Sequence, residues 1–463
     1  MSKKLNKLVI IVSIICFSTP EWGSAQQIST DQPLSLEECV QFALENNYTL
    51  QSTRLQEGIA ETQVGETRAM GLPQASVRSN INYNYEVQKA FLPNALFGPD
   101  TTSNEPFDPE GFTPVQFSPN YDGNATFSVS QLIFDGSYFV GLQAAKTLRE
   151  LRQKETNQSE IETVEAVTKA YYTVLINQER SELVDANINQ LEELLNDTRA
   201  LNENGFAESI EVDRVQVNLN NTKTEKNKIQ RGLNYAMDLL KFQMGLPLSE
   251  EITLSGDVKN LSLNVTEYAT QIEQFNYEQR VDYRILKTNK ELSELDLKNN
   301  KATHLPKLSA NFSYGYNTGV NEFSELWDFN NNWLSFGAVG ISLQWDLFTG
   351  LRRSNLMQRN RIQIEQLDIQ KEALEKSIDL EIRQLRDNLR SAKESLEVQE
   401  ANKKLANKVF EQSQIKYNNG VGSSNELIEA ETARKTAETN YYNALYDAVI
   451  TQIELEKALG TLY

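Results

Sequence analysis

Few side chains in this 463-residue sequence are suited to catalysis or to binding a metal ion. The only histidine is His304 and the only cysteines are Cys16 and Cys39, too few for a zinc site or a cysteine–histidine nucleophile. The 64 acidic residues offer no carboxylate pair that stands out from the background, and the sequence has no glycine-rich phosphate loop or nucleophile elbow. We therefore expect a protein that is not an enzyme and that uses neither a metal ion nor a cofactor.

The charge balance narrows the choice of partners. The chain carries 45 basic and 64 acidic residues, a formal net charge of −19. Because nucleic-acid binding depends on basic side chains that neutralise phosphates, this balance argues against a nucleic-acid partner. The hydrophobic share of 39% is typical of a folded chain and not of a disordered one.

The first residues predict export from the cytoplasm. Three lysines precede the apolar run at residues 8–17, and small residues follow at 23–25. This order is typical of a secretory signal peptide, to which we assign residues 1–25. Cys16 does not favour lipidation, because Ile15 stands before it, where lipid-attachment signals need a small residue.

Two halves of the sequence share the same landmarks in the same order. Three landmarks recur after 214 or 215 residues and a Leu-Pro pair recurs after 233, which places an insertion between Pro73 and Gly136. This spacing is typical of an internal duplication. The matching positions are Phe134-Asp135-Gly136 with Phe348-Thr349-Gly350, Gly205 with Gly420, Gly245 with Gly460, and Leu72-Pro73 with Leu305-Pro306.

Each half follows one plan, which runs from a helix through two alternating segments to a very long helix, a glycine turn and a shorter returning helix. Residues 26–245 form the first predicted repeat, residues 246–276 an inter-repeat segment, and residues 277–463 the second repeat. We expect the strand pairs at about 75–134 and 307–348, and the helix hairpins to turn at residues 205 and 420.

The alternating segments predict strands with one apolar and one polar face. In the first segment Val77, Ile81 and Tyr83 alternate with polar residues such as Arg78 and Asn80. A soluble sandwich hairpin would show the same alternation. Export and the aromatic-rich apolar faces favour an outer-membrane barrel with a wet interior. Residues 88–120 and 318–332 are then expected to be irregular loops outside the cell.

Four strands cannot close a barrel, so the chain is expected to oligomerise. An open sheet in lipid leaves backbone groups at its edges unpaired, at several kcal/mol each. Two copies would give eight strands around a filled interior, and three copies would give twelve strands with room for a pore. This geometry permits either assembly.

The helices have matching lengths. From Gly136 to Gly205 and from Gly350 to Gly420 the chain runs 69 and 70 residues, enough for helices of roughly 100 Å. Their narrow apolar stripes are typical of coiled coils. A returning helix stacked end to end on the helix before the strands would match this length, which predicts a hollow helical cylinder.

The mature sequence resembles the TolC-like outer-membrane efflux proteins. The resemblance implies an α+β membrane protein in which a homotrimer forms a 12-stranded β-barrel, with four transmembrane β-strands per chain, continued by a long α-helical coiled-coil tunnel in the periplasm. Residues 246–276 would form an equatorial segment. The matching stretches are Leu34-Ser35-Leu36-Glu37-Glu38, Ala43-Leu44-Glu45-Asn46-Asn47, Val281-Asp282-Tyr283-Arg284, His304-Leu305-Pro306-Lys307-Leu308, Trp345-Asp346-Leu347-Phe348-Thr349-Gly350, Tyr417-Asn418-Asn419-Gly420-Val421-Gly422 and Ala458-Leu459-Gly460-Thr461-Leu462.

The resemblance also implies a function, partners and site residues. It implies a passive exit duct in outer-membrane lipid for small molecules or drugs, which works with a periplasmic adaptor (membrane fusion) protein and an inner-membrane transporter. Glu426 and Glu429 match a pair of acidic residues that forms a periplasmic gate, and they share a helix face at i and i+3. The residues that match the adaptor-contacting tips are Gly205, Phe206 and Ala207, with Gly420, Val421 and Gly422.

Two other functions fit the same sequence. The duct would serve a type I protein secretion system equally well. A non-conducting structural coiled-coil protein of the envelope would also show the long helices, but it would tolerate charge on the apolar faces of the strands.

Overall fold

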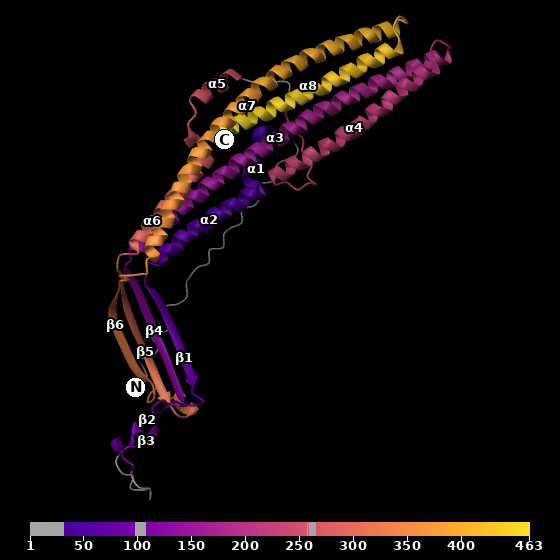
Figure 1. Ribbon diagram of the computed structural model, residues 1–463. Coiled ribbons are helices and arrows are strands. Elements are labelled where there is room, and N and C mark those ends of the chain that lie inside the picture. Colours follow the sequence, from indigo (N-terminus) through magenta and orange to yellow (C-terminus); the bar gives the residue numbers. More distant parts are fainter. Residues whose placement is uncertain (1–31, 98–107, 257, 259–264) are drawn as a thin grey trace. The chain divides into compact units, whose positions relative to one another are not determined.

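The computed structural model describes residues 32–97, 108–256, 258 and 265–463 (Figure 1). The predicted signal peptide at 1–25, with Cys16, lies outside these residues. In chain order the elements are α1 (Leu36–Asn46), α2 (Tyr48–Ala69), β1 (Gln74–Tyr83), β2 (Lys89–Pro93), β3 (Phe112–Gln116), β4 (Tyr121–Phe134), α3 (Gly136–Glu203), α4 (Ser209–Met244), α5 (Val265–Glu273), α6 (Val281–Ala302), β5 (Lys307–Val320), β6 (Leu334–Gln344), α7 (Arg352–Asn418) and α8 (Ser424–Leu459).

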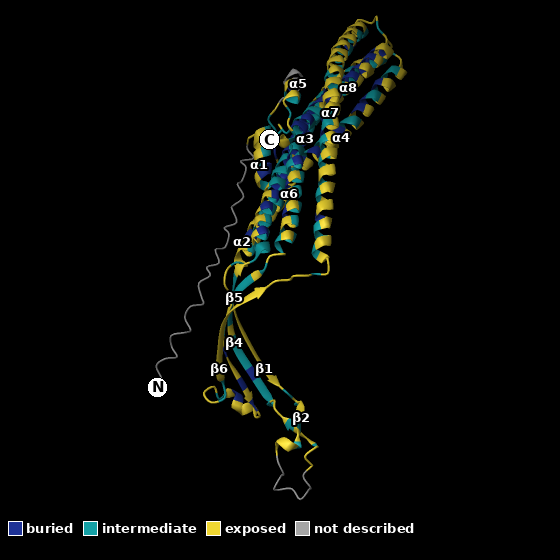
Figure 2. Ribbon diagram, turned by 60° about the vertical axis from the view of Figure 1, so that its left-hand side comes forward, coloured by how far each residue is buried: buried dark blue, intermediate teal, exposed yellow. Residues whose placement is uncertain are grey.

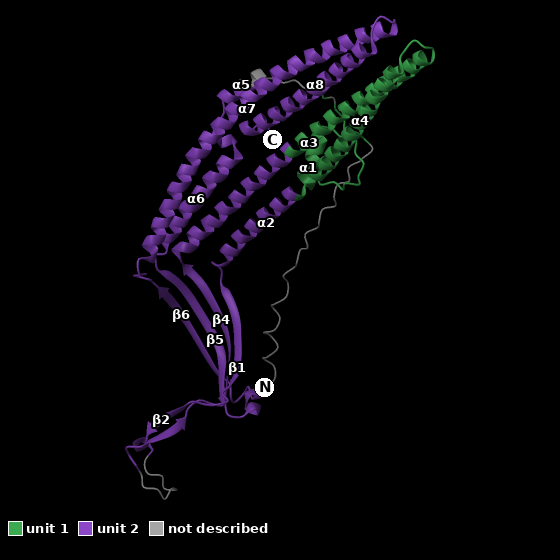
Figure 3. Cartoon of the chain, turned by 45° about the vertical axis from the view of Figure 1, so that its right-hand side comes forward, with its two compact units in different colours: residues 1–48, 166–261 green, residues 49–165, 262–463 purple. Residues whose placement is uncertain are grey.

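The described residues fall into two compact units (Figure 3). The first draws on residues 1–48 and 166–261, and the second on residues 49–165 and 262–463. The units do not coincide with the predicted repeats, because the continuous helix α3 belongs to the second unit up to Glu165 and to the first from Ala166. The repeat boundaries therefore stay a prediction.

The second unit contains a four-stranded antiparallel sheet in the order β1-β4-β5-β6. β1 and β4 lie inside the first predicted strand pair, and β5 and β6 lie inside the second. The two pairs join where β4 runs beside β5, from Tyr121 opposite Val320 to Phe134 opposite Leu308. This order leaves β1 and β6 as the edges of the sheet.

The strand register sorts the side chains onto two faces. Val77 lies opposite Phe127 and Phe127 opposite Tyr314, and a neighbouring row joins Ser76, Ser128 and Ser313. The apolar face is exposed in the chain, and Figure 2 shows exposed residues along the strands. The apolar face includes Val77, Ile81, Phe127, Val129, Phe312, Tyr314, Val339 and Ile341, and the polar face includes Ser76, Asn80, Asn124, Ser128, Asn311, Ser313 and Ser342.

The predicted outer loops are more ordered than the sequence indicated. Within residues 88–120, β2 and β3 pair as a separate two-stranded sheet, and a short 3-10 helix, Phe323–Trp327, follows β5. The expectation of irregular loops was therefore wrong for these segments. Prolines obscured the first of them, because Pro93 and Pro114 lie inside the strands. A two-stranded sheet tolerates proline, since each strand has a free edge that needs no N–H.

The helices of the second unit pack around α7. Its 67 residues contain neither glycine nor proline, and at 1.5 Å per residue it is about 100 Å long. Its partners α6 and α8 both run beside it (Figure 1). Their common core contains Ile378, Ile382, Leu389, Leu455 and Leu459. No helix among the described residues is both long enough and apolar enough to cross a bilayer.

The first unit has its own core between α3 and α4. Val184, Ile188, Leu191 and Leu195 recur at intervals of three or four residues and place one face of α3 against α4. Cys39 of α1 is fully buried, which confirms the expectation of a small buried residue in a helix. Burial raises the pKa of this thiol to about 12, so it stays protonated and unreactive at neutral pH.

The two faces of β5 make a test of which side meets lipid. We expect Phe312→Arg to lower the free energy of insertion into lipid vesicles by about 2–4 kcal/mol, because a cation on the lipid face must enter hydrocarbon. Asn311→Arg on the adjacent polar face is the matched control and should cost far less. Urea titration of folding into vesicles measures both, and equal losses would contradict the assignment of the faces.

Candidate functional site

The turn between α7 and α8 reverses the chain through a left-handed glycine. Gly420 has φ +73°, and the N–H of Val421 donates to the carbonyl of Lys416 at 3.0 Å, which closes the helix end. A side chain at Gly422 would come within 3.0 Å of Lys416 Cβ, so the backbone there needs glycine. Val421 is 78% exposed at the tip of the hairpin.

The turn between α3 and α4, in the first unit, is built in the same way. Gly205 has φ +81°, and the N–H of Phe206 donates to the carbonyl of Leu201 at 2.8 Å. The Asn202 side-chain amide donates to the carbonyl of Ala207 at 2.7 Å and holds the turn closed. Phe206 is 81% exposed. Each turn therefore presents one exposed apolar side chain directly after its glycine.

Glu426 and Glu429 lie in the first turns of α8. Ser423 caps this helix, since its hydroxyl accepts from the N–H of Glu426 at 3.2 Å. Both carboxylates are exposed, whereas Leu427 and Ala430 between and beside them are buried. Among the described residues neither carboxylate has an ion-pair partner. The shared face is therefore acidic and uncompensated, and it lies close to the Gly420 turn.

An open groove of about 700 Å³ between α7 and α8 continues from this acidic face. Glu429 lines it together with Leu405 and Val409 of α7 and Ile428 and Thr432 of α8. Side chains on the same two helices clamp the hairpin. The Arg434 guanidinium lies 3.9 Å from the centre of the Phe410 ring, and the Lys403 ammonium lies 4.2 Å from that of Tyr441.

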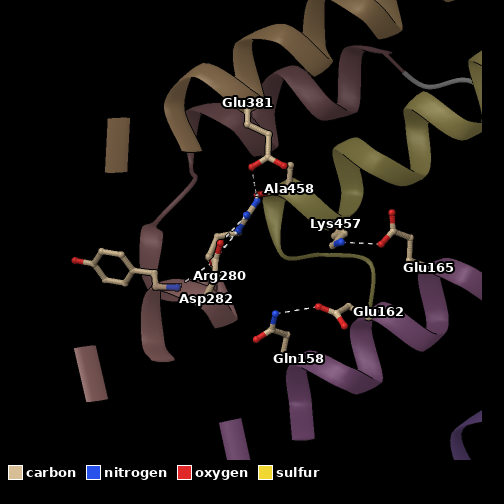
Figure 4. A network of polar contacts seen from close by, with 9 residues as sticks. Gln158, Glu162, Glu165, Arg280, Asp282, Glu381, Lys457 and Ala458 are labelled. Carbon is tan, nitrogen blue, oxygen red and sulfur yellow. Dashed lines mark hydrogen bonds and ion pairs between the residues drawn. The ribbon is translucent and has the colours of Figure 1, made fainter. Parts of the chain in front are cut away.

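A second constellation joins the end of α8 to the start of α6 (Figure 4). Arg280 donates to Asp282 at 2.8 and 3.1 Å, to Glu381 of α7 at 3.0 Å and to the backbone carbonyl of Ala458 at 3.1 Å. Nearby, Lys457 pairs with Glu165 of α3 at 2.7 Å. One guanidinium thus ties three helices together at the point where α8 ends.

The charges at this junction stabilise one another. Burial alone would lower the pKa of Arg280, but hydrogen bonds and charge from Asp282 and Glu381 outweigh it and raise the pKa. Burial would raise the pKa of Asp282, but its hydrogen bonds to Arg280 and that residue's charge leave the pKa below its usual value. Both groups therefore stay charged at neutral pH.

The first unit contains the equivalent junction with a different side chain. The Asn47 amide donates to the carbonyl of Gln243 at 2.7 Å, near the end of α4. Asn47 and Arg280 are 233 residues apart, and Gln243 and Ala458 are 215 apart. These are the spacings of the Leu-Pro pairs and of the helix-terminal glycines, so corresponding side chains bond to corresponding carbonyls.

Left-handed glycines make the two junctions tight. Gly245 has φ +79° and Gly460 has φ +72°. A side chain at Gly460 would come within 2.8 Å of the Gln279 carbonyl oxygen, and one at Gly245 would overlap the carbonyl of Asn46. The end-to-end stacking that the helix lengths predicted is therefore found at both junctions.

Sequence reasoning found the turns and the acidic residues but missed Arg280 and Arg434. The structure brings Gly420, Val421 and Gly422 together with Glu426 and Glu429 in the second unit, and it places Gly205, Phe206 and Ala207 in the first. Applying the spacing of 233 residues to Asn47 would have pointed to Arg280. Among the described residues, no group of three or more His, Cys, Asp or Glu side chains is placed to hold a metal ion.

The sequence was compared with known proteins after this geometry was established. Residues 39–246 and 289–461 match the model of a family described as outer membrane efflux protein. The chain is 21% identical to outer membrane protein TolC of Vibrio cholerae over 463 residues, which cover 99% of this chain and 96% of that protein.

Solved structures show the same fold. The CmeC outer membrane channel of Campylobacter jejuni matches with a TM-score of 0.71 at 14% identity, over 92% of this chain and 86% of that one. The outer membrane protein VceC of Vibrio cholerae matches with a TM-score of 0.67 at 15% identity, over 92% of this chain and 96% of that one.

The Arg280 junction makes a first prediction for this site. We expect Arg280→Gln to lower the local stability of the end of α8 by about 2 kcal/mol, because Asp282 and the Ala458 carbonyl lose a charged donor. Amide hydrogen exchange of residues 452–459 should become roughly 30-fold faster. Arg383→Gln, at an exposed position of α7, is the control. Equal protection in both variants would contradict the role of Arg280.

The pKa of Asp282 makes a second, pH-dependent prediction. Because folding lowers this pKa below 3.8, its contribution to stability is present above that pH and is lost as the pH falls through the folded value. Asp282→Asn should therefore lower the Tm at pH 7, and its difference from the native protein should shrink towards pH 3. Circular dichroism melts over this range measure the difference, and a constant difference would refute the linkage.

Proposed function

Because the chain belongs to the outer membrane efflux protein family, we propose that it is the exit duct through which a tripartite pump expels small molecules. It is an outer-membrane protein whose helical part lies in the periplasm. Transport through such a duct is passive, since the energy comes from the inner-membrane transporter behind it. The single observation that carries the proposal is a sheet with one exposed apolar face, one polar face and two unpaired edges.

The unpaired edges support a homotrimer. In a bilayer the backbone groups of β1 and β6 need partners, and another copy of the chain offers the complementary edge. Three copies would close twelve strands into a β-barrel that is wide enough for an aqueous pore, with the apolar faces towards lipid. The same assembly would place three copies of each helix hairpin around a common tunnel.

The exposed tips support docking to a periplasmic adaptor protein. Phe206 and Val421 are apolar, largely exposed and held by rigid turns. Contacts of this kind lose little entropy on binding, because the turn is already ordered. An adaptor bound at the tips would join the duct to the inner-membrane transporter.

The acidic face of α8 supports a gate at the periplasmic entrance. Three copies of Glu426 and Glu429 around a narrow axis would repel one another and attract cations. A bound divalent cation would bridge carboxylates from different copies and block the current. The gate is therefore expected to select for cations and to close in the presence of divalent ions.

Single-channel conductance in a planar bilayer tests the duct and the gate together. We expect the native trimer to show a small, cation-selective conductance that divalent cations block. The double variant Glu426→Ala, Glu429→Ala should lose that block, because the bridging carboxylates are gone. Glu394→Ala with Glu397→Ala removes an exposed pair at the same spacing in α7 and is the matched control.

The outcomes separate the alternatives. A block that survives in the double variant would remove Glu426 and Glu429 from the gate and leave the channel. Correctly inserted trimers without any conductance would favour a structural coiled-coil protein. A deletion strain that becomes sensitive to toxic small molecules supports efflux, whereas loss of a secreted protein would indicate type I secretion.

A further inference from the structure

The polar face of the sheet carries a single charged side chain in the middle of the strands. β1, β4, β5 and β6 together contain three charged residues, Arg78, Asp122 and Lys307. All three lie on the polar face, because Arg78 is opposite Thr126, Asp122 opposite Asn82, and Lys307 opposite Gln344. Asp122 and Lys307 stand at strand ends, whereas Arg78 is the fifth of the ten residues of β1.

The two terminal charges have partners and Arg78 does not. Asp122 accepts hydrogen bonds from the amides of Asn82 and Asn84, each at 2.9 Å. Lys307 pairs with Asp135 at 3.1 Å. Arg78 is exposed and has no ion pair with any described residue. Four residues of strand, about 13 Å, separate its row from that of Asp122, so this acid is too far away to pair with the guanidinium.

The row of Arg78 leaves open space beside the guanidinium. It continues through Thr126, Gly315 and Phe336 across the sheet. A side chain at Gly315 would overlap the Ala125 carbonyl and would come within 3.1 Å of the Phe336 ring, which therefore lies beside the glycine. Two small residues thus separate a cation from an aromatic ring, which forms a shallow trough on the polar face.

We propose that Arg78 makes the barrel segment of the duct attract anions, so that the duct favours solutes that carry negative charge. This inference rests on the proposed trimer, in which three copies of Arg78 form a ring inside the barrel. A lipid-facing arginine in the middle of a strand would cost about 2–4 kcal/mol, so the guanidinium belongs in the water-filled interior. The ring is opposite in sign to the acidic entrance formed by Glu426 and Glu429.

The size of the barrel allows three charges to act on the whole lumen. Twelve strands about 4.8 Å apart and tilted about 40° close at a backbone radius of roughly 12 Å. An inward arginine reaches about half of that radius. Its charge therefore lies within a Debye length of the axis, which is about 10 Å at 0.1 M salt and about 3 Å at 1 M. The effect should be clear in dilute salt and weak in concentrated salt.

The reversal potential under a KCl gradient measures this preference. We expect Arg78→Gln to raise the ratio of potassium to chloride permeability about twofold near 0.1 M salt, with little change near 1 M. Arg78→Lys keeps the charge and should behave like the native protein. Asn80→Gln changes a side chain on the same face of the same strand without changing charge, and it should leave the ratio unaltered.

A chemical variant separates charge from structure. Arg78→Cys places a thiol on the polar face, whereas Cys39 is fully buried and its thiol stays protonated. Reaction with a cationic methanethiosulfonate should restore the native permeability ratio, and an anionic reagent should raise the ratio further. This comparison is made within one inserted channel, so a change in folding cannot produce it.

The failure of this inference differs from the failure of the proposed duct. Inserted trimers without conductance, native and variant alike, would overturn the duct. Conducting trimers whose permeability ratio is the same for the native protein, Arg78→Gln and both modified forms of Arg78→Cys would overturn only the role of Arg78.

Discussion

The unsatisfied edges of one sheet are the constraint on which the rest of this molecule depends. β1 and β6 each present a row of backbone groups that water would satisfy and hydrocarbon would not. A chain with this sheet in a bilayer must therefore find its own copies. The polar interior, the lipid-facing aromatics and the arrangement of the helices around one axis all follow once the edges are paired.

The helix junctions solve a similar problem in water. Each returning helix ends in carbonyls without intrahelical partners, and a neighbouring chain segment supplies a donor to one of them. In the first unit the donor is the amide of Asn47, and in the second it is the guanidinium of Arg280. Left-handed glycines at 245 and 460 then let the backbones approach closely enough for the stacked helices to replace one long helix.

Much of the fold was predictable because its patterns are long and regular. Period-two alternation located β1, β4, β5 and β6 and their apolar faces, and the absence of glycine and proline predicted α7. β2 and β3 were missed, since Pro93 and Pro114 break the usual strand composition. The site was less predictable. The contact of Arg280 with Glu381 and Ala458 joins residues 101 and 178 positions apart, and no local pattern reports such a distance. Glu426 and Glu429 were found by resemblance, and their exposure on one face agrees with the gate proposal without testing it.

The different donors at the two junctions have a consequence for how the halves of the chain respond to their surroundings. A neutral amide bond is nearly indifferent to ionic strength, whereas the bonds of Arg280 with Asp282 and Glu381 weaken as salt screens them. A change in the periplasmic medium therefore acts on one half of a duplicated chain and passes over the other. Duplication supplied two copies of a fastening, and divergence made only one of them sensitive to the environment.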